Sequence, residues 1–256
     1  YYDNQAKRVE GLKQNTLRMI LAAQVFPIIS GLADEKQINR ILKNAQRYLW
    51  DKKLKSFHLN TDFKKEQHNL GRAFSFVYGD KENGAFFNHM LVMFAHALYR
   101  RNFVKEGWQV LSSIYNMAID ANKSKIYPCL PEYFNLEGRG MYAYLTGSAS
   151  WFALTMLTEV FGLKGKDGDL LIEPKLCSAQ FKDVSILTIN RIFAGRKLQV
   201  NFSNPKRLTF GKYRIIKAGL NSGDLALSES QRIIIPRERI LKLPANIINI
   251  LDIVFG

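Results

Sequence analysis

The segment Gly-Asp-Lys-Glu-Asn-Gly-Ala-Phe-Phe-Asn-His, residues 79–89, is the part of this sequence most typical of a binding site. A loop rich in charged and amide side chains runs into an apolar stretch, and His89 stands within two turns of the helix start predicted there. The N-terminal end of a helix favours anions, and a histidine at that end can donate to a phosphate. The residues alone leave another interpretation open, a solvated loop with capping residues and a core histidine.

A second candidate site begins with Gly-Arg-Gly at residues 138–140 and continues to Thr146, Gly147 and Trp151. Thr146 and Gly147 directly precede a predicted helix, so their hydroxyl and backbone N–H groups could face an oxyanion. The alternative is that Thr146 is an N-cap and Trp151 anchors the core. The chain carries 37 Lys and Arg against 22 Asp and Glu, a net charge of +15, and this balance favours an anionic partner.

Other kinds of site are not supported by the residues. The four histidines and two cysteines lack the spacing of metal ligands, so we predict no metal site. No Gly-x-Ser-x-Gly motif is present, and basic runs such as residues 52–55 lack the aromatic pattern of RNA-binding proteins. We therefore predict no nucleic-acid partner. The apolar stretch at residues 19–29 is too short to span a bilayer, and two cysteines fit a reducing compartment, so we expect a cytoplasmic protein without a membrane partner.

The first two-thirds of the chain carries helical periodicity. The stretch at residues 34–49 is amphipathic and begins at a predicted Asp34 N-cap, and the stretch at 85–99 is apolar nearly all round and is expected to be buried. Paired helices with functional loops at one end are typical of a helical toroid or solenoid. Helices are predicted at residues 11–29, 34–49, 85–99, 107–121 and 148–161.

The pattern changes after residue 165. Short apolar or alternating runs, separated by Gly, Asn and Pro, predict antiparallel strands. We therefore expect a helical part at residues 1–166 and a β part at residues 167–256. The predicted strands cover residues 170–172, 184–189, 198–202 and 232–235.

Three ordered motifs resemble those of glycoside hydrolase family 94, which contains inverting disaccharide and oligosaccharide phosphorylases. Residues 79–89 are similar to its Lys-Glu-Asn-Gly-Gly…Asn-His signature, and residues 138–151 to its Gly-Arg-Gly…Thr-Gly-Ser/Thr-Ala-x-Trp. Residues 168–176 resemble its transition into a C-terminal β domain. Residues 24–26, 59–63 and 131–134 look most like the branch that acts on β-1,2-linked glucans.

The resemblance implies a role for particular residues. In an inverting phosphorylase, inorganic phosphate replaces the water that an inverting glycosidase activates, so the enzyme needs an anion cradle and no second carboxylate. The substrates would be an oligosaccharide and phosphate as co-substrate, with no cofactor. His89, Thr146 and Gly147 match the family's phosphate-binding positions, and Arg139 is a further candidate beside them. Lys81 and Glu82 match sugar-contacting positions, and Glu132 is an additional candidate for the sugar site.

One departure from the family pattern concerns catalysis. The family's general acid is an Asp in an Asp-Trp-Asn-Asp-like segment, which this sequence lacks, so we assign no catalytic residue to this chain. We expect an α+β piece of a larger enzyme: the C-terminal part of an (α/α) helical barrel followed by an antiparallel β-sandwich or jelly-roll-like domain. By itself the piece should be inactive.

Other interpretations stay open. Cyclic β-glucan synthases carry a similar module, and a non-catalytic carbohydrate-binding or scaffold fragment is a further alternative. Since family members often pair through domains that this sequence lacks, the resemblance suggests a homodimer of the parent enzyme.

Overall fold

A computed structural model describes residues 1–13, 15–65, 67–143, 147–221, 223–227 and 231–256. The chain forms two compact units, Tyr1–Thr155 and Met156–Gly256. The sequence placed the division after residue 166. In the structure, the strand Leu163–Lys166 pairs with the strand Asp169–Ile172 inside the second unit.

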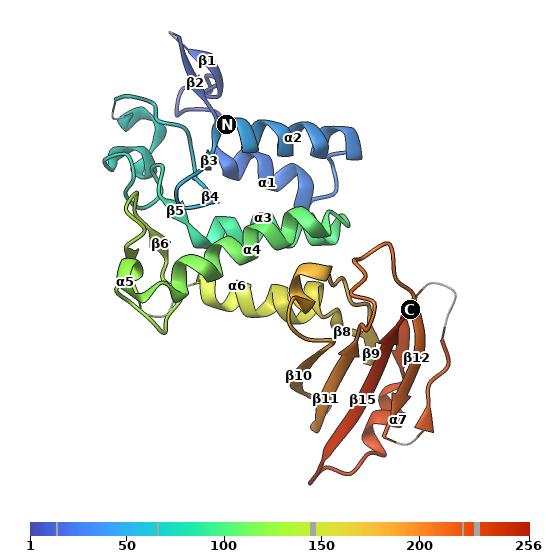
Figure 1. Ribbon diagram of the computed structural model, residues 1–256. Coiled ribbons are helices and arrows are strands. Elements are labelled where there is room, and N and C mark those ends of the chain that lie inside the picture. The colour runs from blue at the N-terminus through green and yellow to red at the C-terminus, as the bar shows by residue number, and fades with distance from the viewer. Residues whose placement is uncertain (14, 66, 144–146, 222, 228–230) are drawn as a thin grey trace. The chain divides into compact units, whose positions relative to one another are not determined.

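The helices of the first unit pack around α3 (Asn88–Arg100), which contacts α1 (Leu21–Ile29), α4 (Val104–Ile119) and α6 (Gly147–Thr155) (Figure 1). The apolar pattern of α3 predicted a buried helix, and this prediction is confirmed. Its buried residues include Leu91, Val92, Phe94, Ala95, Ala97, Leu98 and Tyr99.

The helix α2 (Glu35–Tyr48) begins as its sequence predicts. The Asp34 carboxylate accepts a hydrogen bond from the Gln37 backbone N–H at 2.7 Å, and the Gln37 side chain accepts from the Asp34 N–H at 2.8 Å. This reciprocal pair satisfies two N–H groups that a helix start otherwise leaves without partners.

The prediction of one helix over residues 11–29 is wrong in its first half. The strands β1 (Gly11–Lys13) and β2 (Thr16–Arg18) form an antiparallel hairpin, with Leu12 opposite Leu17. Asn15 takes a left-handed conformation with φ 63° in the turn, which Asn tolerates better than most residues. Leu17, Leu21 and Val25 follow a helical spacing of four residues, whereas Leu12 stands five positions before Leu17, about 140° around a helix from it. The helical spacing therefore does not extend back to Leu12.

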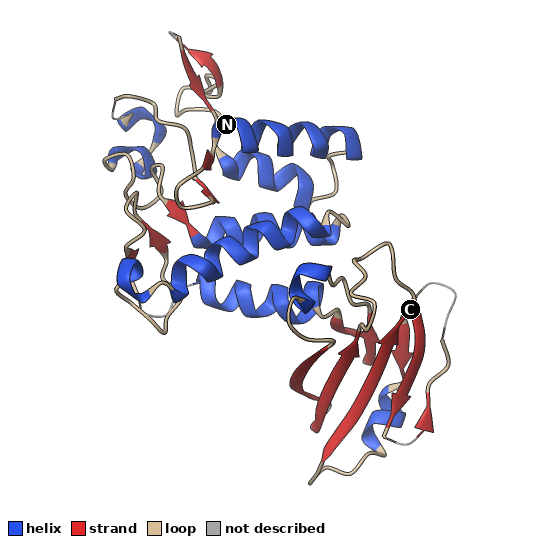
Figure 2. Cartoon of the chain, viewed as in Figure 1, coloured by secondary structure: helices blue, strands red, loops and turns tan. Residues whose placement is uncertain are grey.

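Short strands and turns connect the helices of this unit, and the loop-rich part near α5 carries several of them (Figure 2). A three-stranded sheet in the order β5-β6-β7 leads into α3. The remaining elements are β3 (Trp50–Asp51), β4 (Ser56–Phe57), η1 (His68–Leu70), η2 (Arg72–Ser75), β5 (Phe86–Phe87), α5 (Ala121–Ser124), β6 (Tyr133–Phe134) and β7 (Gly140–Met141).

The second unit contains a five-stranded sheet in the order β10-β11-β15-β12-β13 and a three-stranded sheet in the order β14-β9-β8. The four predicted strands are present, but the expectation of antiparallel pairing throughout is wrong. The last strand, β15, lies parallel to β11, with Val200 opposite Leu251. It enters between β11 and β12, and strand spacing along the chain cannot reveal such an insertion. The larger sheet is therefore mixed.

Alternation along β11 and β15 places one side of each strand in the core. Buried residues of these strands include Leu198, Val200, Phe202, Leu251, Ile253 and Phe255. The elements of the unit are η3 (Met156–Val160), β8 (Leu163–Lys166), β9 (Asp169–Ile172), η4 (Ser178–Phe181), β10 (Ile186–Phe193), β11 (Arg196–Ser203), β12 (Ile215–Leu220), β13 (Gly223–Asp224), β14 (Ile233–Ile235), α7 (Arg237–Leu241) and β15 (Ile248–Phe255).

Within the part of the chain that the structure describes, no helix is both long enough and apolar enough to cross a membrane.

Candidate functional site

The first turns of α3 and α6 bring His89 and Gly147 together, although the two residues come from different motifs. A methyl group in place of the Gly147 hydrogen would lie 2.8 Å from Cε1 and 3.0 Å from Nδ1 of His89. Only a residue without a side chain leaves the imidazole in this position. Two helix starts, a histidine and a glycine backbone therefore converge, which is an arrangement that suits an anion. Thr146, the other residue expected here, lies outside the described residues.

A single carbonyl group ties these two helix starts to each other. The Asn88 amide donates to the Pro131 oxygen at 2.9 Å, and the Ser148 hydroxyl donates to the same oxygen at 3.0 Å. Both donor side chains are fully buried, so the two hydrogen bonds are shielded from competing water. Because Asn88 precedes His89 and Ser148 follows Gly147, the Pro131 carbonyl holds the two site residues at a fixed spacing.

Asn88 and Ser148 are not among the residues that the sequence predicts to bind phosphate or sugar. Both belong to the quoted motifs, and each adjoins a predicted phosphate-binding residue. Their shared acceptor lies far from both in the sequence, so its identity could not be read from local spacing.

Trp151 lies one turn into α6, beside His89. Its ring centroid is 6.1 Å from that of His89 and 5.4 Å from that of His96, which meets it edge-on. The His96 Nδ1 is 3.2 Å from the Thr155 hydroxyl. Trp151 thus forms an apolar wall behind the imidazole and limits its movement.

The backbone of Glu132 connects the start of α3, where His89 lies, to a second polar cluster that contains Lys81 and Tyr142. Its carbonyl accepts from the Asn88 N–H at 2.9 Å, and its N–H donates to the Tyr142 carbonyl at 3.1 Å. The Lys81 ammonium lies 4.6 Å from the centre of the Tyr142 ring. Hydrogen bonding with Tyr142 raises the pKa of Lys81, so the amine is charged at neutral pH. Lys81 is therefore linked through Tyr142 and Glu132 to Asn88, the residue before His89.

Tyr133 and Asp80 lie in the same cluster. The Tyr133 hydroxyl donates to an Asp80 carboxylate oxygen at 3.2 Å. Burial raises the pKa of Tyr133 to about 12, and the Asp80 charge adds to the shift. The phenol consequently stays neutral and keeps its proton as a donor.

Glu82 has one oxygen with a partner and one without. Its Oε1 is 3.5 Å from an Arg72 guanidinium nitrogen, whereas its Oε2 is buried and has no hydrogen-bond partner among the described residues. Buried polar atoms nearly always have a partner, so this oxygen is suited to a donor from a bound molecule, such as a sugar hydroxyl.

Arg139 lies in the turn of the β6–β7 hairpin. Its backbone N–H donates to the Asn135 side chain at 2.9 Å in the turn, and its side chain is exposed. Glu132 and Tyr142 occupy the opposite end of the hairpin, next to Asn88. The backbone of Glu132 thus lies at the Asn88 end of the hairpin, and the backbone of Arg139 lies at its turn.

Comparisons with known proteins match these motifs to a family. The chain is 25% identical over 225 residues to a cellobionic acid phosphorylase of Neurospora crassa, an alignment that covers 78% of this chain and 27% of that protein. It is 22% identical over 189 residues to the cyclic beta-(1,2)-glucan synthase NdvB of Rhizobium meliloti, which covers 70% of this chain and 7% of that protein. The chain therefore spans about a quarter of the first relative and a small part of the second.

The sequence model described as "Glycosyl hydrolase 94 superfamily, catalytic domain" matches residues 1–162, well over half of the 256 residues. The match includes the turns that hold His89, Glu132 and Gly147. It confirms the resemblance found in the sequence, and the chain belongs to the glycosyl hydrolase 94 superfamily.

Proposed function

We propose that this chain is the phosphate-binding part of an inverting glycoside phosphorylase. The observation that carries the proposal is the contact between His89 and Gly147, held by two buried hydrogen bonds to Pro131. Two helix starts with an imidazole between them suit an anion such as inorganic phosphate better than a neutral sugar. The similarity to a protein named cellobionic acid phosphorylase supports the same conclusion.

In the proposed reaction, a phosphate oxygen forms a bond to the anomeric carbon while the glycosidic C–O bond breaks on the opposite face of the sugar. The leaving oxygen takes a proton from a general acid, and the products are a sugar 1-phosphate and a shortened saccharide. His89, the Gly147 backbone and Thr146 would hold the phosphate, with Arg139 in a more distant supporting position. Lys81, Glu82 and Glu132 would bind the sugar next to it.

We also propose an architecture for the two units, a substrate class and a location. We place the helical unit in an (α/α) barrel and the second unit in a β-sandwich-like domain, as the family resemblance implies. The substrate would be a β-glucoside, either a β-1,2-glucan or a related glucobiose. Both cysteines are unpaired, which fits the cytoplasm as the expected location. The family resemblance implies that the parent enzyme would act as a homodimer.

Phosphate binding can be tested on the chain as it stands. The His89 imidazole resonances should shift on titration with inorganic phosphate, and calorimetry should show saturable binding. His89→Ala should abolish the heat signal, whereas His68→Asn, a change at an exposed histidine in η1, should leave it intact. Absence of any phosphate-dependent shift at His89, or equal binding by His89→Ala, would show that the site does not hold phosphate.

A second candidate is the phosphorylase-like module of a cyclic glucan synthase, supported by the similarity to NdvB. The two differ in the parent protein's dependence on phosphate. A phosphorylase releases sugar 1-phosphate from a glucobiose only when phosphate is present. We expect this chain alone to bind phosphate without turnover, since it lacks the Asp-Trp-Asn-Asp-like segment.

A further inference from the structure

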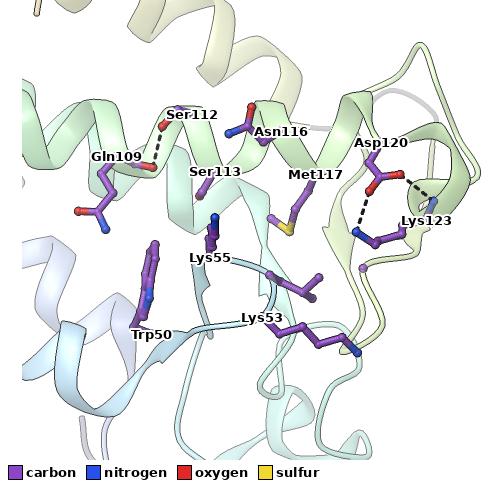
Figure 3. A pocket seen from close by; sticks show the side chains of 12 residues that line it. Trp50, Lys53, Lys55, Gln109, Ser112, Ser113, Asn116, Met117, Asp120 and Lys123 are labelled. Carbon is purple, nitrogen blue, oxygen red and sulfur yellow. Dashed lines mark hydrogen bonds and ion pairs between the residues drawn. The ribbon is translucent and has the colours of Figure 1, made fainter. Parts of the chain in front are cut away.

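A pocket of about 490 Å³ lies between the turn of the β3–β4 hairpin and the C-terminal half of α4 (Figure 3). None of the residues of the His89 and Lys81 clusters lines it. Its volume falls in the roughly 300–1,000 Å³ range of small-molecule sites.

One wall of the pocket is aromatic and the opposite wall is polar. The Trp50 indole stands on the hairpin, fixed edge-on by Phe57 with ring centroids 4.8 Å apart. Gln109 and Asn116 lie along α4 across from it, as Figure 3 shows. Among the described residues, the structure gives neither side-chain amide a hydrogen-bond partner, so both can bond a ligand. An apolar ring face opposite free amides is suited to a sugar ring, which has apolar C–H faces and a polar rim of hydroxyls.

The charges of the pocket do not balance. Asp120 forms an ion pair with Lys123 at 2.9 Å, so this carboxylate is already neutralised. Lys53 and Lys55 also line the pocket, and within the described part of the chain neither has an ion-pair partner. Two ammonium groups without counter-charge favour an anionic ligand.

The hairpin turn sets the direction of Lys55. The Leu54 N–H donates to the Asp51 carboxylate at 2.6 Å, and Lys55 takes a left-handed backbone conformation with φ 54°. Lys55 thereby points from the hairpin toward α4, with its nitrogen between Trp50 and Met117 in Figure 3.

We propose that this pocket binds a hexose unit that carries an anionic group, either a carboxylate or a phosphate. The ring lies against Trp50, its hydroxyls bond Gln109 and Asn116, and the anion pairs with Lys55, while Lys53 adds positive charge farther along the pocket. The pocket shares no lining residue with the site proposed for inorganic phosphate, so a negative result at one site does not contradict the proposal for the other.

The test uses calorimetric titration with glucuronate and with glucose 6-phosphate, with neutral glucose as the comparison. The His89→Ala variant is the starting protein, so that phosphate binding near α3 does not contribute. We expect saturable binding of at least one anionic sugar, with the pair of probes distinguishing carboxylate from phosphate. Glucose should bind about tenfold more weakly or worse, because it loses a charge-assisted contact.

The variants that test the two lysines, and their control, all lie in the turn between β3 and β4. Lys53→Gln combined with Lys55→Gln should weaken binding by about tenfold or more, whereas Lys52→Gln, which removes an equally exposed charge outside the pocket, should leave it unchanged. All three side chains are exposed, so the fold should survive each change. The proposal is overturned if neither anionic sugar binds, if glucose binds equally well, or if Lys52→Gln weakens binding as much as the double variant.

Discussion

Replacing Gly147 with alanine separates the binding role of this residue from its structural role. Gly147 is the first residue of α6, and alanine can take a helical backbone conformation there. The added methyl group would start 2.8 Å from Cε1 of His89. Carbon atoms pack at about 3.5 Å or more, so the imidazole must retreat by about 0.7 Å. Trp151, on the neighbouring turn of α6, limits where it can go.

A shift of this size removes a well-aligned hydrogen bond between His89 and a bound phosphate. A hydrogen bond to a charged group contributes about 1.5–3 kcal/mol, so phosphate affinity should fall about 10- to 150-fold. The higher helix propensity of alanine, up to about 1 kcal/mol, offsets part of the cost of moving the imidazole, so the stability of the protein should change by less than the phosphate-binding energy. Calorimetry with inorganic phosphate measures the affinity, and thermal unfolding measures the stability.

Two further variants identify the cause. Ser150→Ala changes an exposed residue of the same helix and should leave phosphate binding unaffected. In the double variant of Gly147→Ala and His89→Ala, the two losses should not add, because both act through one imidazole. Additive losses, or unchanged affinity in Gly147→Ala, would refute the inference that the glycine exists to make room for His89.

Three other predictions follow from single contacts. Ser148→Ala removes one of the two bonds to Pro131, so it should lower the free energy of unfolding by about 1–3 kcal/mol and weaken phosphate binding, as measured by denaturant titration and calorimetry. Asp34→Ala breaks the capping box of α2 and should cost about 1 kcal/mol in the same denaturant assay without changing phosphate affinity. Burial raises the pKa of the Cys177 thiol to about 11, so this thiol should stay protonated and unreactive at pH 8. Iodoacetamide should therefore label the folded protein at Cys129 only. Mass spectrometry of the Cys129→Ser variant should then show no label.

Local patterns determined much of the helical unit. The Asp34 cap and the buried helix at residues 88–100 follow from side-chain chemistry within a few turns, which the sequence carries in full. Leu12 and Leu17 show the limit of such reasoning, because they were grouped with the helical residues that follow and instead lie opposite each other in a hairpin. The parallel pairing of β15 with β11 was also beyond local patterns, since a strand's neighbour is chosen by the whole sheet.

The sequence by itself determined the family and the types of residue available to bind phosphate and sugar, because both reside in short motifs. It did not determine which of those residues meet. The packing of α3 against α6 brings His89 to Gly147, and the Pro131 carbonyl, which accepts from Asn88 and Ser148 at once, helps to set their spacing. The same packing leaves Arg139 at the far end of its hairpin. The physical reason is that such contacts join residues far apart in the chain, and their geometry depends on how whole helices and strands pack.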